Sequence, residues 1–311
     1  MQRNASGETI ASYRDTFRLL LTYVQTALQK KPAELSFSDL SAEVILEFLD
    51  YIEKNRHNKV RSRNVRLAAI RSFMQYAVLF VPSEIADINR VLAIPSKRFE
   101  QPMMDFLSQE EIQSILSSCS STWSGKRDHV MFSTLYNTGA RVSEIITLKV
   151  CDVHFDHTPY VVIHGKGRKM RTVPIWRSTA NKIKKWILHN NFDNNAPVFP
   201  NRKGMKLTRY GVVNRLQKAV NKATRSCLTL KKHRISPHTF RHAYALHMLQ
   251  SGVDITVIAL CLGHESPATT HKYVDADLSM KESALNKLND VSAGNLRFQP
   301  KDSLIEFLEK L

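Results

Sequence analysis

The segment at residues 94–106 is the feature that most constrains how this chain can fold. It contains two prolines, and no helical spacing of apolar residues runs through it. Proline disfavours helix at the residue before it, so a stretch of this kind predicts an extended connection. We therefore expect two domains, residues 1–98 and residues 107–311, joined by a linker at residues 99–106.

The first domain is expected to be all helical. Apolar residues recur three and four positions apart between Tyr13 and Val24, and again between Val44 and Ile52. Ser41 precedes the second run and is a candidate N-cap. This spacing is typical of amphipathic helices that pack on one another.

A third helix in this domain is expected to have a basic side. Between Asn55 and Arg71 the chain holds six Lys or Arg and no acidic residue, interleaved with apolar positions. This pattern suits a solvated helix face and a face that contacts DNA phosphates about equally well. The basic residues concerned are Arg56, Lys59, Arg61, Arg63, Arg66 and Arg71.

The second domain is expected to be mixed α+β. Ser108 and Glu111 have the spacing of a capping box, which predicts the start of a helix. Two β-rich runs, residues 160–164 and 171–175, flank a glycine-containing turn, which predicts a hairpin with Lys166 at its tip. Helical spacing then resumes toward the end of the chain. The predicted fold class is therefore mainly α with a small antiparallel β-sheet.

The charge balance indicates a polyanionic partner. The chain carries 45 Lys and Arg against 28 Asp and Glu, a formal net charge of +17. A strongly basic surface attracts nucleic acid through long-range attraction and the release of counterions. The apolar runs are short and interrupted by charge, and the N-terminus lacks the apolar core of a signal peptide. We expect no membrane partner and a cytoplasmic location, associated with the bacterial nucleoid.

Four clusters of residues in the second domain carry groups suited to phosphodiester chemistry. They are Gly139-Ala-Arg141-Val-Ser-Glu144, the turn lysine Lys166, His238-Thr-Phe-Arg241-His242, and Leu262-Gly-His264 followed by Tyr273. Each cluster taken alone is more often structural than catalytic. Together they supply cations, a proton donor, two imidazoles and a phenol. Such a set can bind and attack a phosphodiester without a metal or another cofactor.

The reaction explains why these residue types are needed. Displacement at a phosphate diester builds negative charge on the nonbridging oxygens, which guanidinium groups such as Arg141 and Arg241 meet with bidentate hydrogen bonds. The leaving alkoxide needs a proton, and Lys166 is the candidate donor. A tyrosine hydroxyl is a competent covalent nucleophile once its proton is drawn away. Tyr273 lies nine residues after His264, so the chain can fold it back toward the imidazole.

The order of these motifs resembles the tyrosine recombinase, or phage integrase, family, in a style closest to bacterial Xer-type and transposon integrases. The resemblance spans nearly the whole chain. It implies a helical, SAM-like core-binding domain followed by the catalytic domain, which together form a C-shaped clamp on a double-stranded DNA recombination site. It also implies strand exchange through a Holliday junction in a tetramer, with neither metal nor ATP. A companion recombinase is a further partner that the resemblance suggests.

The same resemblance implies a role for each cation of the site. Arg141 and Arg241 would bind the scissile phosphate, and His264 would donate a hydrogen bond to a phosphate oxygen. Lys166 would protonate the 5′ oxygen that leaves.

It further implies how the covalent step is made. Tyr273 would form a 3′-phosphotyrosine bond, with His238 as general base or orienting group. The tail at residues 302–311 has the apolar spacing of a short helix, which is too short to be stable alone and must dock. Its own domain and a neighbouring protomer are both open as docking surfaces.

Other functions compete with this interpretation. Several histidines and Cys261 crowd one region, and His238 and His242 have a spacing that zinc can use, but no H-E-x-x-H motif is present. The four cysteines form no C-x-x-C pair, so we expect free thiols and no metal. A metal-dependent relaxase, a non-enzymatic DNA-binding protein and a topoisomerase-like enzyme that nicks and religates DNA remain as alternatives.

Overall fold

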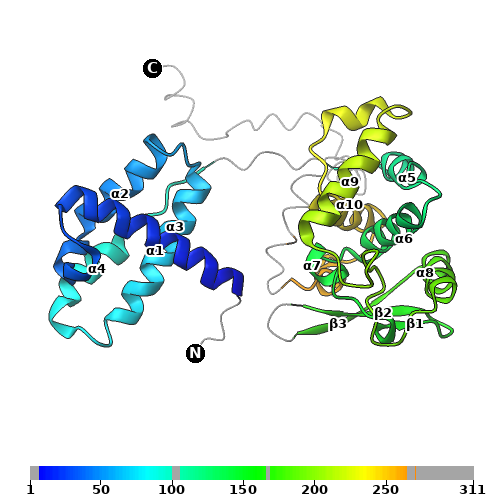
Figure 1. Ribbon diagram of the computed structural model, residues 1–311, viewed down its shortest axis with the longest axis horizontal. Coiled ribbons are helices and arrows are strands. Elements are labelled where there is room, and N and C mark those ends of the chain that lie inside the picture. The colour runs from blue at the N-terminus through cyan, green and yellow to red at the C-terminus, as the bar shows by residue number, and fades with distance from the viewer. Residues whose placement is uncertain (1–6, 100–105, 166–168, 265–269, 271–311) are drawn as a thin grey trace, which may run out of the picture. The chain divides into compact units, whose positions relative to one another are not determined.

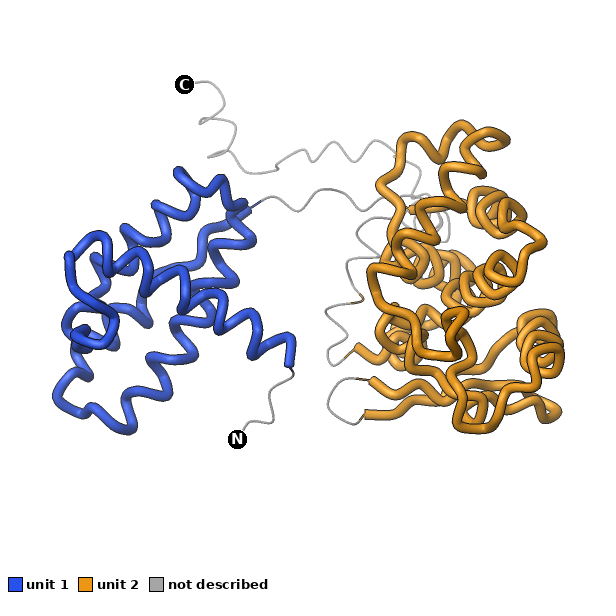
Figure 2. The backbone as a smooth tube through the Cα atoms, viewed as in Figure 1, with its two compact units in different colours: residues 1–102 blue, residues 103–311 orange. Residues whose placement is uncertain are grey.

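The chain folds into two units, residues 1–102 and residues 103–311, which Figure 2 colours separately. The computed structural model describes residues 7–99, 106–165, 169–264 and 270. Lys166, Tyr273 and the tail helix expected at residues 302–311 lie outside the described residues. Within the described part of the chain, none of the helices has the length and apolar character that crossing a membrane requires.

Unit 1 is built from helices packed around one apolar core. The helices are α1 (Gly7–Leu28), α2 (Ala42–Lys54), α3 (Val60–Ala77) and α4 (Ile85–Ala93), with short 3-10 turns between them (Figure 1). Ser41 caps α2 as predicted, because its hydroxyl accepts a hydrogen bond from the backbone N–H of Val44. Phe48 of α2 and Leu67 and Ile70 of α3 are fully buried in the core. The amphipathic helices expected in this part of the chain are confirmed.

Unit 2 places one central helix among several others. Its elements are α5 (Gln109–Ser117), α6 (Trp123–Thr138), α7 (Val142–Ile145), β1 (Val153–His154), β2 (Tyr160–His164), β3 (Met170–Pro174), α8 (Arg177–Asn190), α9 (Arg209–Ala223), α10 (Pro237–Gln250) and α11 (Ile255–Leu262). Helix α6 contacts α5, α7, α8, α9 and α10 (Figure 1). Side chains all around α6 are buried, as a helix at the centre of a domain requires.

The sheet of unit 2 has three antiparallel strands in the order β1-β2-β3. Strands β2 and β3 form the predicted hairpin, with Val161 opposite Val173 and His164 opposite Met170. The backbone N–H of Gly165 donates to the carbonyl of Lys169 at 2.7 Å, which closes the ladder just before the turn. The pairing of the two strands of the predicted hairpin is therefore confirmed.

Gly139 ends α6 at a crowded junction of three helices. Its φ is +58°, in the left-handed region that L residues with a side chain rarely adopt. A Cβ at this position would lie 2.5 Å from the Tyr244 ring of α10 and 2.7 Å from Leu262 of α11. Glycine is therefore required both by the backbone conformation and by the close approach of α10 and α11.

We expect Gly139→Ala to lower the free energy of unfolding of unit 2 by more than about 2 kcal/mol, because strain and steric overlap add. Gly252→Ala is the matched control: Gly252 has a φ of +82°, but a Cβ there would meet no atom within 4 Å. This control carries the backbone strain alone, about 1 kcal/mol. Calorimetric unfolding of both variants checks the difference, and equal losses would contradict the packing argument.

Candidate active site

Three arginines meet at the C-terminal end of α11. Arg171 Nε donates to the carbonyl of Cys261 at 2.8 Å, Arg241 Nη2 to that of Leu262 at 2.7 Å, and Arg141 Nη2 to that of Gly263 at 3.4 Å. The last carbonyls of a helix have no partner within the helix, and the helix dipole makes this end negative. Three consecutive carbonyls of one short helix thus gather three guanidinium groups into a single cluster, which we call the arginine cluster.

Arg241 is the buried member of the arginine cluster. It lies on α10, and only 4% of the residue is exposed. Its Nη1 donates to the carbonyl of Gly139 at 2.7 Å, while its Nη2 binds Leu262. The guanidinium therefore bridges the ends of α6 and α11, which holds the group in place without a carboxylate partner in these two bonds.

Arg141 is the accessible member of the arginine cluster. It is the N-cap residue of α7, and its side chain is 37% exposed. Glu144 accepts hydrogen bonds from the backbone N–H of Arg141 at 2.7 Å and from its Nη1 at 3.0 Å. Glu144 thus holds both an arginine side chain and the start of α7. Arg141 is thereby fixed at its base while its side chain stays open to a ligand.

Arg171 is a member of the arginine cluster that the sequence motifs missed. Its Nη1 and Nη2 donate to the two carboxylate oxygens of Glu144 at 3.0 and 2.7 Å, and its side chain is only 12% exposed. The sequence holds a signal for it. Strand residues alternate between faces, and Arg171 shares the inward face with buried Val173, where an apolar residue is expected.

Glu144 is the carboxylate that balances the arginine cluster. Burial alone raises the pKa of the Glu144 carboxyl, but hydrogen bonds from Arg171 and from the Arg141 backbone, together with both guanidinium charges, outweigh burial and lower the pKa below its ordinary value. Glu144 is therefore ionised at neutral pH although only 4% of its side chain is exposed.

The two predicted histidines flank the arginine cluster. His264 follows Gly263 directly, and its Nδ1 lies 2.8 Å from the hydroxyl oxygen of Thr270. His238 is exposed in the first turn of α10, three positions before Arg241, so the two side chains share a helix face. The structure therefore brings Arg141, Arg241 and His264 together, and His238 lies one helical turn before Arg241.

Comparison with known proteins finds a matching protein family for each of the two units. Residues 105–280 match the phage integrase family, and residues 1–79 match the N-terminal SAM-like domain of phage integrases. The chain belongs to the phage integrase family. The family recognised from the ordered motifs is thereby confirmed, together with the fold class and with the tyrosine recombinase activity that defines the family.

This phage integrase has relatives that match it over most of its length. It is 43% identical over 311 residues to the integrase/recombinase y4rC of Sinorhizobium fredii, covering 100% of this chain and 94% of that protein. It is 30% identical over 279 residues to the tyrosine recombinase XerD of Oceanobacillus iheyensis, covering 88% of this chain and 89% of that protein.

Solved structures share the fold. The XerH site-specific recombinase bound to a palindromic difH substrate aligns with a TM-score of 0.70 at 20% identity, covering 91% of this chain and 81% of that chain. The Tn1549 transposon integrase in complex with a circular intermediate DNA aligns with a TM-score of 0.69 at 14% identity, covering 92% of this chain and 95% of that chain.

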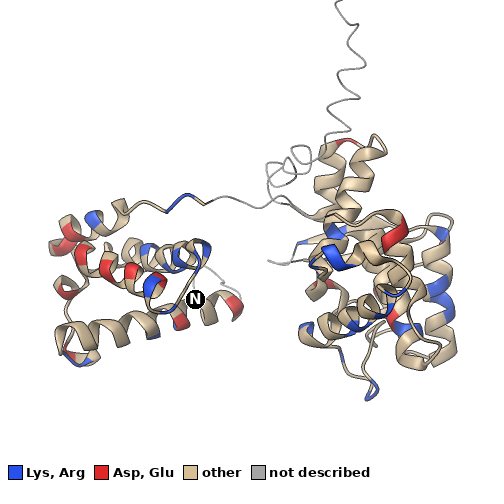
Figure 3. Cartoon of the chain, turned by 90° about the horizontal axis from the view of Figure 1, so that it is seen from above, with Lys and Arg blue, Asp and Glu red and all other residues tan. Residues whose placement is uncertain are grey.

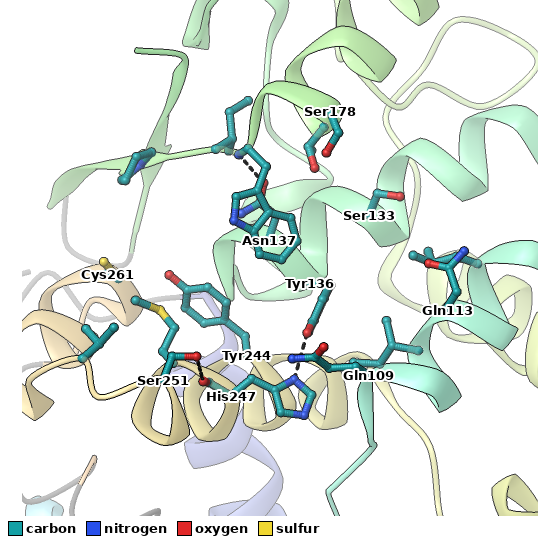
Figure 4. A pocket seen from close by; sticks show the side chains of 18 of the residues that line it. Gln109, Gln113, Ser133, Tyr136, Asn137, Ser178, Tyr244, His247, Ser251 and Cys261 are labelled. Carbon is teal, nitrogen blue, oxygen red and sulfur yellow. Dashed lines mark hydrogen bonds between the residues drawn. The ribbon is translucent and has the colours of Figure 1, made fainter.

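A groove of about 710 Å³ adjoins the arginine cluster of this phage integrase. Helices α5, α6, α8, α10 and α11 line it, and Cys261 and Tyr244 lie on its wall (Figure 4). Tyr136 and His247 are in contact with each other on its lining, with the hydroxyl oxygen 2.8 Å from Nδ1 (Figure 4). Burial lowers the pKa of His247. In the described residues no three His, Cys, Asp or Glu side chains gather in a way that could hold a metal ion.

The basic helix of unit 1 divides into exposed and engaged residues. Arg56, Lys59 and Arg61 are exposed at the start of α3 or just before it. Arg63 is 3% exposed, and its Nε lies 3.3 Å from a carboxylate oxygen of Glu53. Two further members are half-buried: Arg66 donates to the Thr16 hydroxyl and Arg71 to the Ile94 carbonyl.

These contacts limit which basic residues can reach a DNA backbone. A guanidinium that lies inside the unit beside a carboxylate is not accessible, and the carboxylate neutralises its charge. Arg63 is therefore not a candidate for a contact with DNA. Lys and Arg are spread over the ribbons of both units (Figure 3), so the basic surface is not confined to α3.

We expect Glu144→Gln to destabilise unit 2 at neutral pH by about 3 kcal/mol, because two guanidinium groups lose a buried carboxylate. The folded-state pKa of Glu144 lies below its ordinary value of 4.5, so its contribution is complete above that value and is lost as the pH falls through the lowered folded-state pKa. The difference in melting temperature between wild type and variant should therefore shrink in acid. Asp156→Asn, at an exposed position, is the control and should show no such trend. A constant difference across the pH series would contradict the assignment.

Proposed function

We propose that this phage integrase cleaves and rejoins DNA at a specific site through a covalent bond between Tyr273 and a DNA 3′ phosphate. The observation that carries the proposal is the arginine cluster, in which Arg141 and Arg241 are held side by side on the carbonyls of α11. His264 comes two residues after the end of that helix, and Tyr273 follows nine residues later in the sequence. The imidazole of His264 and the phenol of Tyr273 thus lie close in sequence to α11, and the carbonyls at the end of α11 hold the cations.

The proposed cleavage step is an in-line displacement at phosphorus. The Tyr273 oxygen forms a bond to phosphorus, the bond from phosphorus to the 5′ oxygen breaks, and the phenol proton passes to a base, for which His238 is the candidate. Lys166 gives a proton to the leaving 5′ oxygen. Arg141 and Arg241, with His264, bind the nonbridging oxygens as their negative charge grows. The products are a 3′-phosphotyrosine and a free 5′ hydroxyl.

The second step reverses the first with a different strand. A 5′ hydroxyl attacks the phosphotyrosine and gives its proton to Lys166, the tyrosine oxygen leaves and takes back the proton held by the base, and a phosphodiester is restored. One phosphoester bond replaces another in each step, so the sequence of steps needs no ATP. Exchange of two strands at a time then passes through a Holliday junction.

The DNA partner is supported by charge and by the neighbouring folds. The chain has a net charge of +17, and its structural neighbours include recombinases in complex with their DNA sites. We propose that this chain likewise binds a double-stranded recombination site in the cytoplasm, as a tetramer in which residues 1–98 form the core-binding domain. Docking of residues 302–311 on a neighbouring protomer and a companion recombinase are parts of the same proposal.

We expect Tyr273→Phe to abolish the covalent complex and leave DNA binding unchanged, because only the nucleophilic oxygen is removed. The wild-type protein is incubated in chelating buffer with a nicked suicide duplex that carries the cognate site, sought in the DNA flanking the gene. A denaturing gel and mass spectrometry then locate any adduct. Tyr76→Phe, at an exposed tyrosine of unit 1, is the matched control and should form the adduct at the wild-type rate.

The outcomes separate the competing functions. No adduct on a duplex that is demonstrably bound would support a non-enzymatic DNA-binding protein. An adduct without exchange in a two-site assay would support topoisomerase-like nicking and religation. Loss of the adduct in chelating buffer would support a metal-dependent relaxase.

We expect Arg61→Ala to weaken DNA binding and to make its salt dependence less steep. Each phosphate contact contributes about −0.9 to the slope of log K against log salt concentration, so loss of one contact changes the slope by about that amount. Arg14→Ala is the control, because Arg14 is a highly exposed arginine on α1, outside the basic helix. Binding titrations at several salt concentrations check this, and an unchanged slope for Arg61→Ala would remove α3 from the DNA surface.

A further inference from the structure

Arg171 uses its guanidinium to join three elements of unit 2. Nε binds the carbonyl of Cys261 at the end of α11, and the two terminal nitrogens bind the two oxygens of Glu144 on α7. Arg171 itself lies on β3. An end-on, bidentate pair of this kind fixes orientation as well as distance, and a lysine cannot reproduce it. The strand is therefore tied to both α7 and α11 by one side chain.

The position of Arg171 on β3 determines which part of the hairpin these contacts hold in place. Arg171 pairs with Ile163 of β2, one pair before the ladder ends at His164 and Met170. Its neighbour Met170 is 67% exposed, so the ion pair, not apolar packing, anchors the end of β3 next to the turn. Lys166 comes only two residues after His164, the last residue of β2, in the sequence. Holding Arg171 therefore fixes the strand ends that the segment with Lys166 connects.

The carboxylate of Glu144 links this base to the phosphate-binding arginine. The same oxygen, Oε1, lies 3.0 Å from Nη1 of Arg141 and 3.0 Å from Nη1 of Arg171. The approach is close on the other side as well, since a Cβ at Gly263 would lie 2.9 Å from Nη1 of Arg171. Arg171 thus fixes the relative positions of Arg141, of the hairpin strand ends, and of Gly263, the residue before His264.

The charges show that Arg171 is not itself a second phosphate-binding group. Its side chain is 12% exposed and faces both oxygens of an ionised Glu144, so its charge is neutralised where it lies. Arg141 shares that carboxylate but is 37% exposed. Of the two arginines that share Glu144, Arg141 is therefore the one whose positive charge remains available to a ligand.

We propose that Arg171 is a positioning residue for strand cleavage: it holds the base of the hairpin turn so that the lysine of the turn delivers its proton to the leaving 5′ oxygen, and it does not touch the DNA. This inference rests on the proposed function, in which Lys166 is that proton donor. It predicts a defect in leaving-group protonation and none in phosphate binding.

The test compares two leaving groups. One suicide duplex has an ordinary 5′ oxygen at the scissile bond, and the other has a bridging sulfur, which leaves as a thiolate and needs no proton. Arg171→Lys keeps the charge but loses the fork. We expect it to cleave the oxygen duplex about tenfold to hundredfold more slowly than wild type, since general acid catalysis contributes about that much or more. On the sulfur duplex its rate should return to within a few-fold of the wild-type rate.

Matched variants distinguish a defect in leaving-group protonation from a defect in phosphate binding. Lys166→Ala should show the same recovery on sulfur, whereas Arg141→Ala should be slow on both duplexes because its defect is in phosphate binding. Thr172→Ala, on the opposite face of β3, should be normal on both. Arg171→Gln is the second variant, and gel shifts and melting curves establish that each protein is folded and binds the duplex.

Each outcome decides the proposal. Recovery of Arg171→Lys or Arg171→Gln on sulfur supports it. A folded variant that is equally slow on both duplexes, or as fast as wild type on oxygen, overturns the role of Arg171 while leaving the proposed function intact if Lys166→Ala recovers. Failure of Lys166→Ala to recover, or absence of a Tyr273 adduct in wild type, overturns the proposed chemistry and this inference with it.

Discussion

The carbonyl groups at the end of α11 are the constraint on which the rest of the site depends. Like charges repel, so three guanidinium groups do not gather without fixed negative partners. Consecutive carbonyls of Cys261, Leu262 and Gly263 supply three such partners at spacings set by the backbone. Because these partners are backbone atoms, their position depends on how α11 packs against α6 and α10. The arrangement of the site is thus inherited from helix packing.

Two glycines show how closely packing and chemistry are coupled. Gly139 ends α6 and accepts a hydrogen bond from Arg241, while a side chain there would collide with Tyr244. Gly263 ends α11 with a φ of +62°, and a side chain there would collide with Arg171. Both positions combine a left-handed helix end with the approach of another element. The same residues therefore terminate the helices and make room for the arginine cluster.

Much of this molecule could be predicted from residue spacing, and the exceptions have physical reasons. Capping boxes, helical periods and the hairpin depend on neighbours in sequence, so Ser41, Ser108 and the β2–β3 ladder were predicted correctly. The start of α6 at Trp123 has no local signal beyond the Thr122 cap, because its first turn holds no apolar period. Arg171 was missed because its partners lie 27 and 90 residues away, and strand alternation marks it as facing inward without showing what it binds.

Some charges of the arginine cluster are neutralised by neighbours and hold the structure, whereas others stay available to bind a phosphate. Arg171 and Glu144 neutralise each other in a largely buried pair, and Arg241 is held by the negative ends of two helices. Arg141 shares Glu144 with Arg171 and keeps a side chain open to solvent. Sharing one carboxylate between Arg141 and Arg171 orients both while neutralising only one of their two charges. The charge that remains attracts a phosphate, and a second carboxylate beside Arg141 would cancel it.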